Sequence, residues 1–91
     1  MNLELPIFFK NEAFDIAELT GKDVPYTDFD VRKMTFYSID AISKHKDEAD
    51  GKEYACIHSN GTEFICALGY KETNKLIYES ITADRSNKQI H

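Results

Sequence analysis

Three side chains near the middle of the chain are of types that occur together in catalytic sites. Cys56 and His58 stand two positions apart, and Glu63 follows five positions later. A thiol can act as a nucleophile, an imidazole as a general base near neutral pH, and a carboxylate can orient that imidazole. Whether the three can cooperate depends on the fold of this segment, because adjacent side chains of a strand point to opposite faces.

The dipeptide Asn60-Gly61 predicts that residues 53–68 form a β-hairpin with a two-residue turn. Asn and Gly both tolerate the positive φ that a type I′ turn requires at its two central positions. This turn places His58 directly opposite Glu63 on the partner strand. We interpret the two residues as a cross-strand polar pair, which contributes a few tenths of a kcal/mol.

The cysteines and histidines do not assemble into a reactive or metal-binding set. Cys56 shares a face with His58, but it lies roughly 7 Å away along the strand, which is long for a nucleophile–base hydrogen bond. Cys66 falls on the opposite face, so the two cysteines are predicted to be unbonded, buried residues. His45 and His91 are scattered, and no spacing provides four zinc ligands. We therefore predict no enzyme, no metal and no cofactor.

Both faces of the predicted hairpin are largely apolar. The first face holds Ala55, Ile57, Phe64, Cys66 and Leu68, and the second holds Tyr54, Cys56, His58, Glu63, Ile65 and Ala67. A helix at the C-terminus is the expected cover of the first face. The second face needs cover from the N-terminal segment or from another chain, and uncovered apolar area marks an interface.

The flanking N-terminal segments add a strand and a short helix. Alternating apolar residues predict a strand over 3–9, and Pro6, which has no N–H to donate, places it at a sheet edge. Residues 11–20 fit a helix with Asn11 as its N-cap and Gly21 as its stop, although the central part also fits a strand.

Residues 34–38 predict a strand, and a corner at 39–42 leads into another that ends near Lys46. The helical spacing of apolar residues predicts a helix over about 70–82, followed by a frayed polar tail over 83–91. The fold class is therefore α+β, a single small domain with an antiparallel sheet of four or five strands.

The chain is acidic, with a net charge of −5 that comes from its first third. Residues 1–30 hold seven Asp or Glu and two Lys, whereas residues 31–91 are balanced. This acidic surface repels phosphates and argues against nucleic acid as a partner. No apolar run approaches the roughly 20 residues needed to span a bilayer, and no signal peptide is recognisable. The expected compartment is the cytoplasm.

One pattern resembles two known families. It consists of Phe36-x-x-Ile39-x-x-Ile42, then Asn60-Gly61-x-x-Phe64-Ile65-Cys66, then Glu72 and Leu76-Ile77. In this order it is similar to the small FlbD-type flagellar accessory proteins and to the first half of LytTR-type DNA-binding domains. The resemblance covers about residues 34–78 and implies a corner, a hairpin with a Gly turn and a short helix. It carries no functional residue over, and the basic second half of a LytTR-type reader has no counterpart here.

The sequence predicts a non-enzymatic interaction or accessory module that binds a protein partner or itself. Aromatic and aliphatic residues that could anchor a partner are Tyr26, Tyr37, Tyr54, Ile65 and Tyr78, since tyrosine gives a large contact area at low entropic cost. The alternative is a nucleic-acid-binding regulator that uses a small basic rim made of Arg32, Lys33, Lys44 and Lys46.

Overall fold

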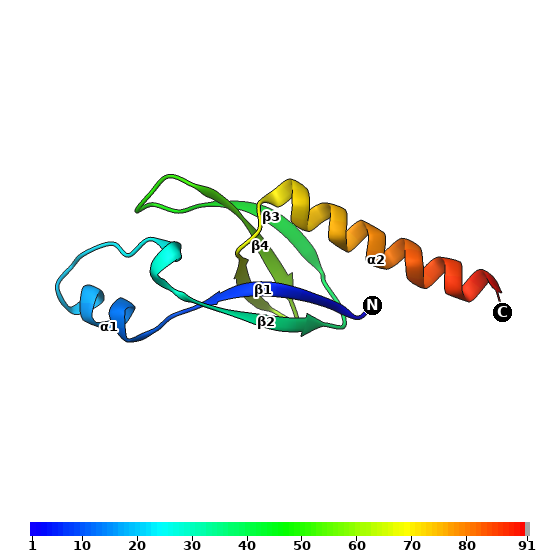
Figure 1. Cartoon of the computed structure of the whole chain (residues 1–91), viewed down its shortest axis with the longest axis horizontal. Helices are drawn as coiled ribbons and strands as arrows, with labels where there is room; N and C mark the ends of the chain where they lie inside the picture. Colours follow the sequence, from blue (N-terminus) through cyan, green and yellow to red (C-terminus); the bar gives the residue numbers. More distant parts are fainter. Residues whose placement is uncertain (91) are drawn as a thin grey trace.

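The computed structural model describes the backbone of residues 1–90 and the side chains of residues 1–83. Within this part, five strands form one antiparallel sheet in the order β2-β1-β5-β4-β3 (Figure 1). The strands are β1 (Leu3–Phe9), β2 (Asp30–Phe36), β3 (Ala41–Lys46), β4 (Glu53–Ser59) and β5 (Thr62–Cys66). The helices are α1 (Glu12–Leu19), a 3₁₀ turn η1 (Tyr26–Asp28) and α2 (Tyr70–Ile90). The predicted α+β class is confirmed.

The hairpin of β4 and β5 has the predicted register. Asn60 and Gly61 adopt φ angles of 52° and 77°, as a type I′ turn requires, and His58 lies opposite Glu63. Cys56 is paired with Ile65 and Cys66 with Ala55, so the cysteines point to opposite faces. Both are free and buried, as predicted.

The hydrophobic core lies between the first face of the sheet and α2. Leu5, Ile7 and Ile57 are completely or almost completely buried there, and Ile77 of α2 packs against them. Thr73 of α2 is fully buried, and its hydroxyl contacts the sulfur of Cys66 at 3.5 Å. The C-terminal helix therefore covers the first face, as the sequence indicated.

The N-terminal segment between β1 and β2 contains the short helix rather than a strand. The side chain of Asn11 caps α1 by accepting a hydrogen bond from the amide of Phe14 at 3.1 Å. At the other end Gly21 has φ +72°, and the amide of Lys22 donates to the carbonyl of Ala17, which completes a Schellman motif. The caps at Asn11 and Gly21 thus explain why residues 11–20 form a helix and not a strand.

Strand β1 is not at an edge, so the position predicted from Pro6 is wrong. β1 lies between β2 and β5. The carbonyl of Pro6 accepts a hydrogen bond from the amide of Ala67 at 2.8 Å. Because the N–H and C=O of one strand residue point to the same side, the missing N–H of Pro6 faces Ala67, just past the end of β5. There the ladder ends, and the missing donor is tolerated.

Helix α2 is longer than predicted. It continues past the predicted end near Thr82 to Ile90, and the fraying of residues 83–91 stays a prediction; His91 lies outside the described residues. The segment 83–90 contains no Gly or Pro that would end a helix. α2 projects beyond the sheet, at the end of the molecule opposite α1 (Figure 1).

Candidate functional site

The segment between α1 and β2 folds over one end of the second face of the sheet. Tyr26 of η1 stacks on Phe8 with ring centroids 5.3 Å apart, and it meets the ring of Tyr54 edge-on at 5.7 Å. Its hydroxyl shares a hydrogen bond of 2.9 Å with Nε2 of His45 on β3. The N-terminal segment therefore supplies part of the cover that this face needs.

Asp47, in the turn between β3 and β4, fixes η1 in this position. Its carboxylate accepts a hydrogen bond from the amide of Tyr26 at 2.8 Å and another from the amide of Ala49 at 3.0 Å. Asp47 is 3% exposed. Burial raises the pKa of the Tyr26 phenol, and the negative charge of Asp47 raises it further. The phenol is neutral near pH 7 even without this shift, so the raised pKa only extends that neutral form to higher pH.

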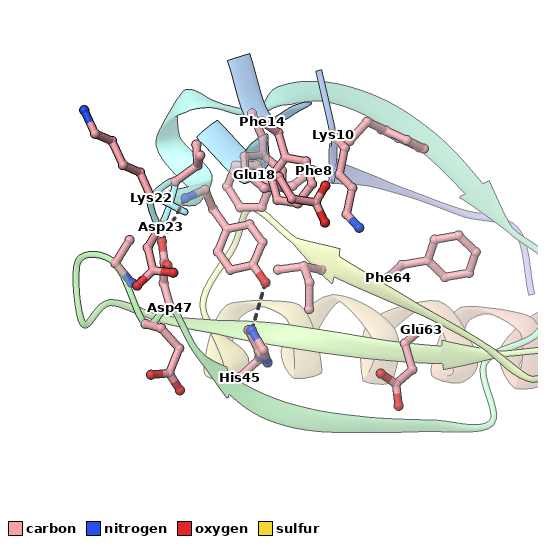
Figure 2. A pocket seen from close by; sticks show the side chains of 17 residues that line it. Phe8, Lys10, Phe14, Glu18, Lys22, Asp23, His45, Asp47, Glu63 and Phe64 are labelled. Atoms are coloured by element: carbon pink, nitrogen blue, oxygen red, sulfur yellow. Dashed lines mark hydrogen bonds between the residues drawn. The ribbon is translucent and has the colours of Figure 1, made fainter. Parts of the chain in front are cut away.

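A groove with a volume of about 800 Å³ opens beside η1, between β1 and β5. Its lining includes the last two residues of β1, Phe8 and Phe9, with Lys10 just after them, and three consecutive residues of β5, Glu63 to Ile65. Consecutive side chains of a strand point to opposite faces, so a cavity that touches all three must lie at the strand edge. Figure 2 shows Lys10 and Phe8 across the cavity from Glu63.

The groove exists because β1 and β5 separate. β1 is paired with β2 through seven residues and β5 with β4 through five, but β1 and β5 share one pair, Ile7 with Cys66. Beyond this pair the two strands diverge, and α1 and η1 stand over the opening.

The rim of the groove is acidic. Five carboxylates and two lysine ammonium groups belong to its lining, an excess of three negative charges. The carboxylates are those of Glu18, Asp23, Asp47, Glu48 and Glu63. Within the described part of the chain, Glu18, Asp23 and Glu48 form no ion pair. The rim therefore has unneutralised negative charge next to an apolar floor.

A second polar arrangement joins His58 to side chains on both of its sides. Its Nε2 lies 3.0 Å from the hydroxyl of Ser43 on β3, and its Nδ1 lies 3.6 Å from the carboxylate of Glu63. This order of hydroxyl, imidazole and carboxylate is that of a hydrolytic triad. The row lies on an open part of the sheet, however, where Ser43 is exposed and the Glu63 side chain is 71% exposed, so water competes for every contact.

The thiol of Cys56 lies beside this row but is poorly suited to attack a substrate. Burial raises its pKa, although a hydrogen bond with Ser43 opposes the shift. Since the thiolate is the nucleophilic form, a raised pKa leaves the cysteine protonated near neutral pH. Cys56 acts as a small buried residue of the second face.

We expect His58→Gln to change the free energy of unfolding by less than about 0.5 kcal/mol, because exposed polar pairs contribute little. Urea denaturation of the variant and the parent protein measures this difference. A loss of more than about 2 kcal/mol would show that Ser43, His58 and Glu63 form a strongly coupled network.

The structure brings together only part of the interaction surface predicted from the sequence. Tyr26 and Ile65 both line the groove, and Tyr54 supports Tyr26 from beneath while remaining 8% exposed. Tyr37, at the end of β2, and Tyr78, on α2, are 73% and 69% exposed and do not belong to the groove lining. Tyr37 and Tyr78 therefore do not form one continuous surface with the groove.

The four cations predicted as one basic rim lie on two opposite edges of the sheet. Arg32 and Lys33 are on β2, whereas Lys44 and Lys46 are on β3. Three strands stand between β2 and β3, which amounts to about 19 Å at the usual strand spacing. The single rim is therefore wrong, because the strand order could not be read from the sequence.

Several groove residues were missed by the sequence reasoning. No sequence pattern assigned a role to Asp47, and Phe8 and Phe14 were predicted only as members of a strand and a helix. The density of aromatic residues in 8–29 was the available signal, because such a cluster needs cover from a sheet. Nothing in the sequence placed Asp47 beneath Tyr26, 21 positions away.

Two further features are absent from the described residues. These residues contain no cluster of three or more His, Cys, Asp or Glu side chains able to hold a metal ion. No helix within them is long and apolar enough to cross a membrane.

Comparison with protein-family models, with curated proteins and with solved structures finds no match to this chain. The resemblance to FlbD-type proteins and LytTR-type domains therefore stays a prediction, and the site must be interpreted from its own geometry.

Proposed function

We propose that this protein is a non-enzymatic interaction module that binds a segment of a partner protein in the groove between β1 and β5. The observation that carries the proposal is the groove, whose volume of about 800 Å³ falls in the range typical of binding sites. Phe8, Phe14 and Ile65 offer apolar contact in it, and charged groups at the rim can fix the orientation of a partner.

The chemistry of the reactive side chains supports a binding role over catalysis. The thiol of Cys56 is held protonated by burial. The Ser43–His58–Glu63 row is open to water, which weakens the contacts that would activate a serine. The free, separated cysteines further fit a reducing compartment, and we propose the cytoplasm.

A nucleic-acid-binding role has less support. The cations of the expected rim are divided between β2 and β3, and the groove has an excess of negative charge that repels phosphates. The groove favours a protein segment as its occupant.

Selection from a displayed library of random peptides tests the proposal with two matched variants. Ile65→Gln places a polar side chain in the groove, and Val31→Gln makes a similar change on β2, outside the groove lining, where Val31 is 53% exposed. We expect peptides selected on the parent protein to bind Ile65→Gln at least about tenfold more weakly, which corresponds to the loss of roughly one apolar contact of 1.4 kcal/mol.

Val31→Gln is expected to retain the parent affinity for the same peptides. If both variants weaken peptide binding equally, or if Ile65→Gln leaves the peptide affinity unchanged, the groove is not the binding site. Thermal unfolding of both variants checks that each is folded.

A further inference from the structure

Building on the proposed function, we infer that the groove takes an extended, basic segment of the partner, which adds to β5 as a further strand. Three independent observations lead to this occupant: the direction of the backbone groups of β5, the size of the opening, and the charge of its rim.

The backbone of β5 faces the groove with unpaired groups. In a hairpin with a two-residue turn, the residues that flank the turn form a hydrogen-bonded pair, and such pairs alternate along the ladder. Thr62, Phe64 and Cys66 therefore direct their N–H and C=O toward β4, while Glu63 and Ile65 direct theirs toward β1. The amide of Ala67 donates to the carbonyl of Pro6, so the Ile7–Cys66 pair is of the non-hydrogen-bonded kind and the amide of Phe8 donates to the carbonyl of Ile65. The amide of Ile65 and both backbone groups of Glu63 belong to no residue pair with β1. A strand edge is thus open inside the groove.

The size of the groove fits a short strand. One residue of a strand takes up about 3.3 Å along the strand, about 4.8 Å in the direction of the neighbouring strand and about 10 Å perpendicular to the sheet. These dimensions give about 160 Å³ per residue. The groove volume of about 800 Å³ therefore holds about five extended residues. The part of β5 that forms no residue pair with β1 runs from Thr62 to Ile65, four residues in which the carbonyl of Ile65 is already bonded to β1. An added strand would satisfy the free amide and carbonyl of Glu63 and the free amide of Ile65.

The rim selects a basic segment. Glu18 on α1 and Glu48 in the turn after β3 line the groove from two different elements, and both lack an ionic partner among the described residues. Lysine or arginine side chains of an added strand can reach these carboxylates, while its alternate apolar side chains contact Phe8 and Ile65.

Three synthetic heptapeptides test the inference by fluorescence anisotropy against the intact protein. The first alternates Lys and Val, the second has Glu in place of every Lys, and the third is the basic peptide with N-methyl groups on alternate amides. We expect the basic peptide to bind at least about tenfold more tightly than the acidic one and than the N-methylated one, because these changes remove charge complementarity and the backbone donors respectively.

The variant Glu18→Lys/Glu48→Lys is expected to weaken the basic peptide about tenfold and to strengthen the acidic one. Glu79→Lys, an exposed site on α2 outside the groove, makes the same kind of charge change and serves as the control. Hydrogen exchange adds a direct readout: binding of the basic peptide should slow the amides of Glu63 and Ile65 at least about tenfold.

The possible outcomes separate this inference from the proposed function. Equal affinity for the N-methylated and unmodified basic peptides would overturn strand addition, and equal affinity for acidic and basic peptides would overturn charge selection, while the groove remained a binding site. If the protein alone sediments as a dimer and hydrogen exchange shows that its Glu63 and Ile65 amides are protected, the occupant of the groove is a second copy of this chain and not a different partner. If no heptapeptide binds, and if the library peptides bind Ile65→Gln as tightly as the parent protein, the proposed function fails as well.

Discussion

Ile57→Ala is expected to destabilise the protein by about 2–5 kcal/mol, the usual cost of truncating a buried aliphatic side chain and leaving a cavity. Ile57 is completely buried on the interior strand β4, opposite Ile42 on one side and Phe64 on the other. A domain of this size has a total stability of about 5–14 kcal/mol, so the change removes a large share of it. Thermal unfolding followed by far-UV circular dichroism should show a midpoint lower by about 10 °C or more.

Ile16→Ala is the matched control for this experiment. Ile16 lies on α1 with 57% of its surface exposed, and alanine is a good helix former, so we expect a change within about 0.5 kcal/mol. Comparable losses for the two variants would contradict a core centred between the sheet and α2.

Asp47→Ala is expected to cost about 1–3 kcal/mol and to disrupt the groove without unfolding the sheet. The substitution leaves the amides of Tyr26 and Ala49 without the acceptor that they share, and an unsatisfied donor costs about this much. With its anchor removed, η1 should separate from Phe8 and Tyr54. Hydrogen exchange of the Tyr26 amide should accelerate, and the affinity for groove-binding peptides should fall.

Asp50→Ala provides a control in the same turn. Asp50 also accepts one backbone hydrogen bond, from the amide of Lys52 at 2.8 Å, but it is exposed to water, which can replace the lost acceptor. We expect it to leave the Tyr26 amide and the peptide affinity unchanged. Unaltered protection of Tyr26 in Asp47→Ala would mean that the aromatic contacts alone hold η1.

The groove illustrates how a local rule can be correct while its consequence is not. Pro6 does lack a donor, and a strand that contains proline belongs where its N–H is not needed. An N–H is not needed at a sheet edge, and it is also not needed where a ladder between two strands ends. Pro6 stands at such a ladder end, because β1 and β5 share only one residue pair. The same short ladder leaves part of the β5 edge open. The one-pair ladder between β1 and β5 therefore explains both why the edge position predicted for β1 is wrong and why the groove exists.

The amino-acid sequence by itself determined the hairpin register, the separation of Cys56 from Cys66, the caps of α1 and the apolar stripe of α2. Each of these depends on residues close together in the chain, where turn chemistry and side-chain periodicity act directly. Only the tertiary structure decided the strand order, the burial of Asp47 beneath Tyr26, the opening between β1 and β5 and the division of the basic residues between two edges. These features depend on pairings between segments far apart in the sequence, and neither periodicity nor composition specifies which distant edges meet.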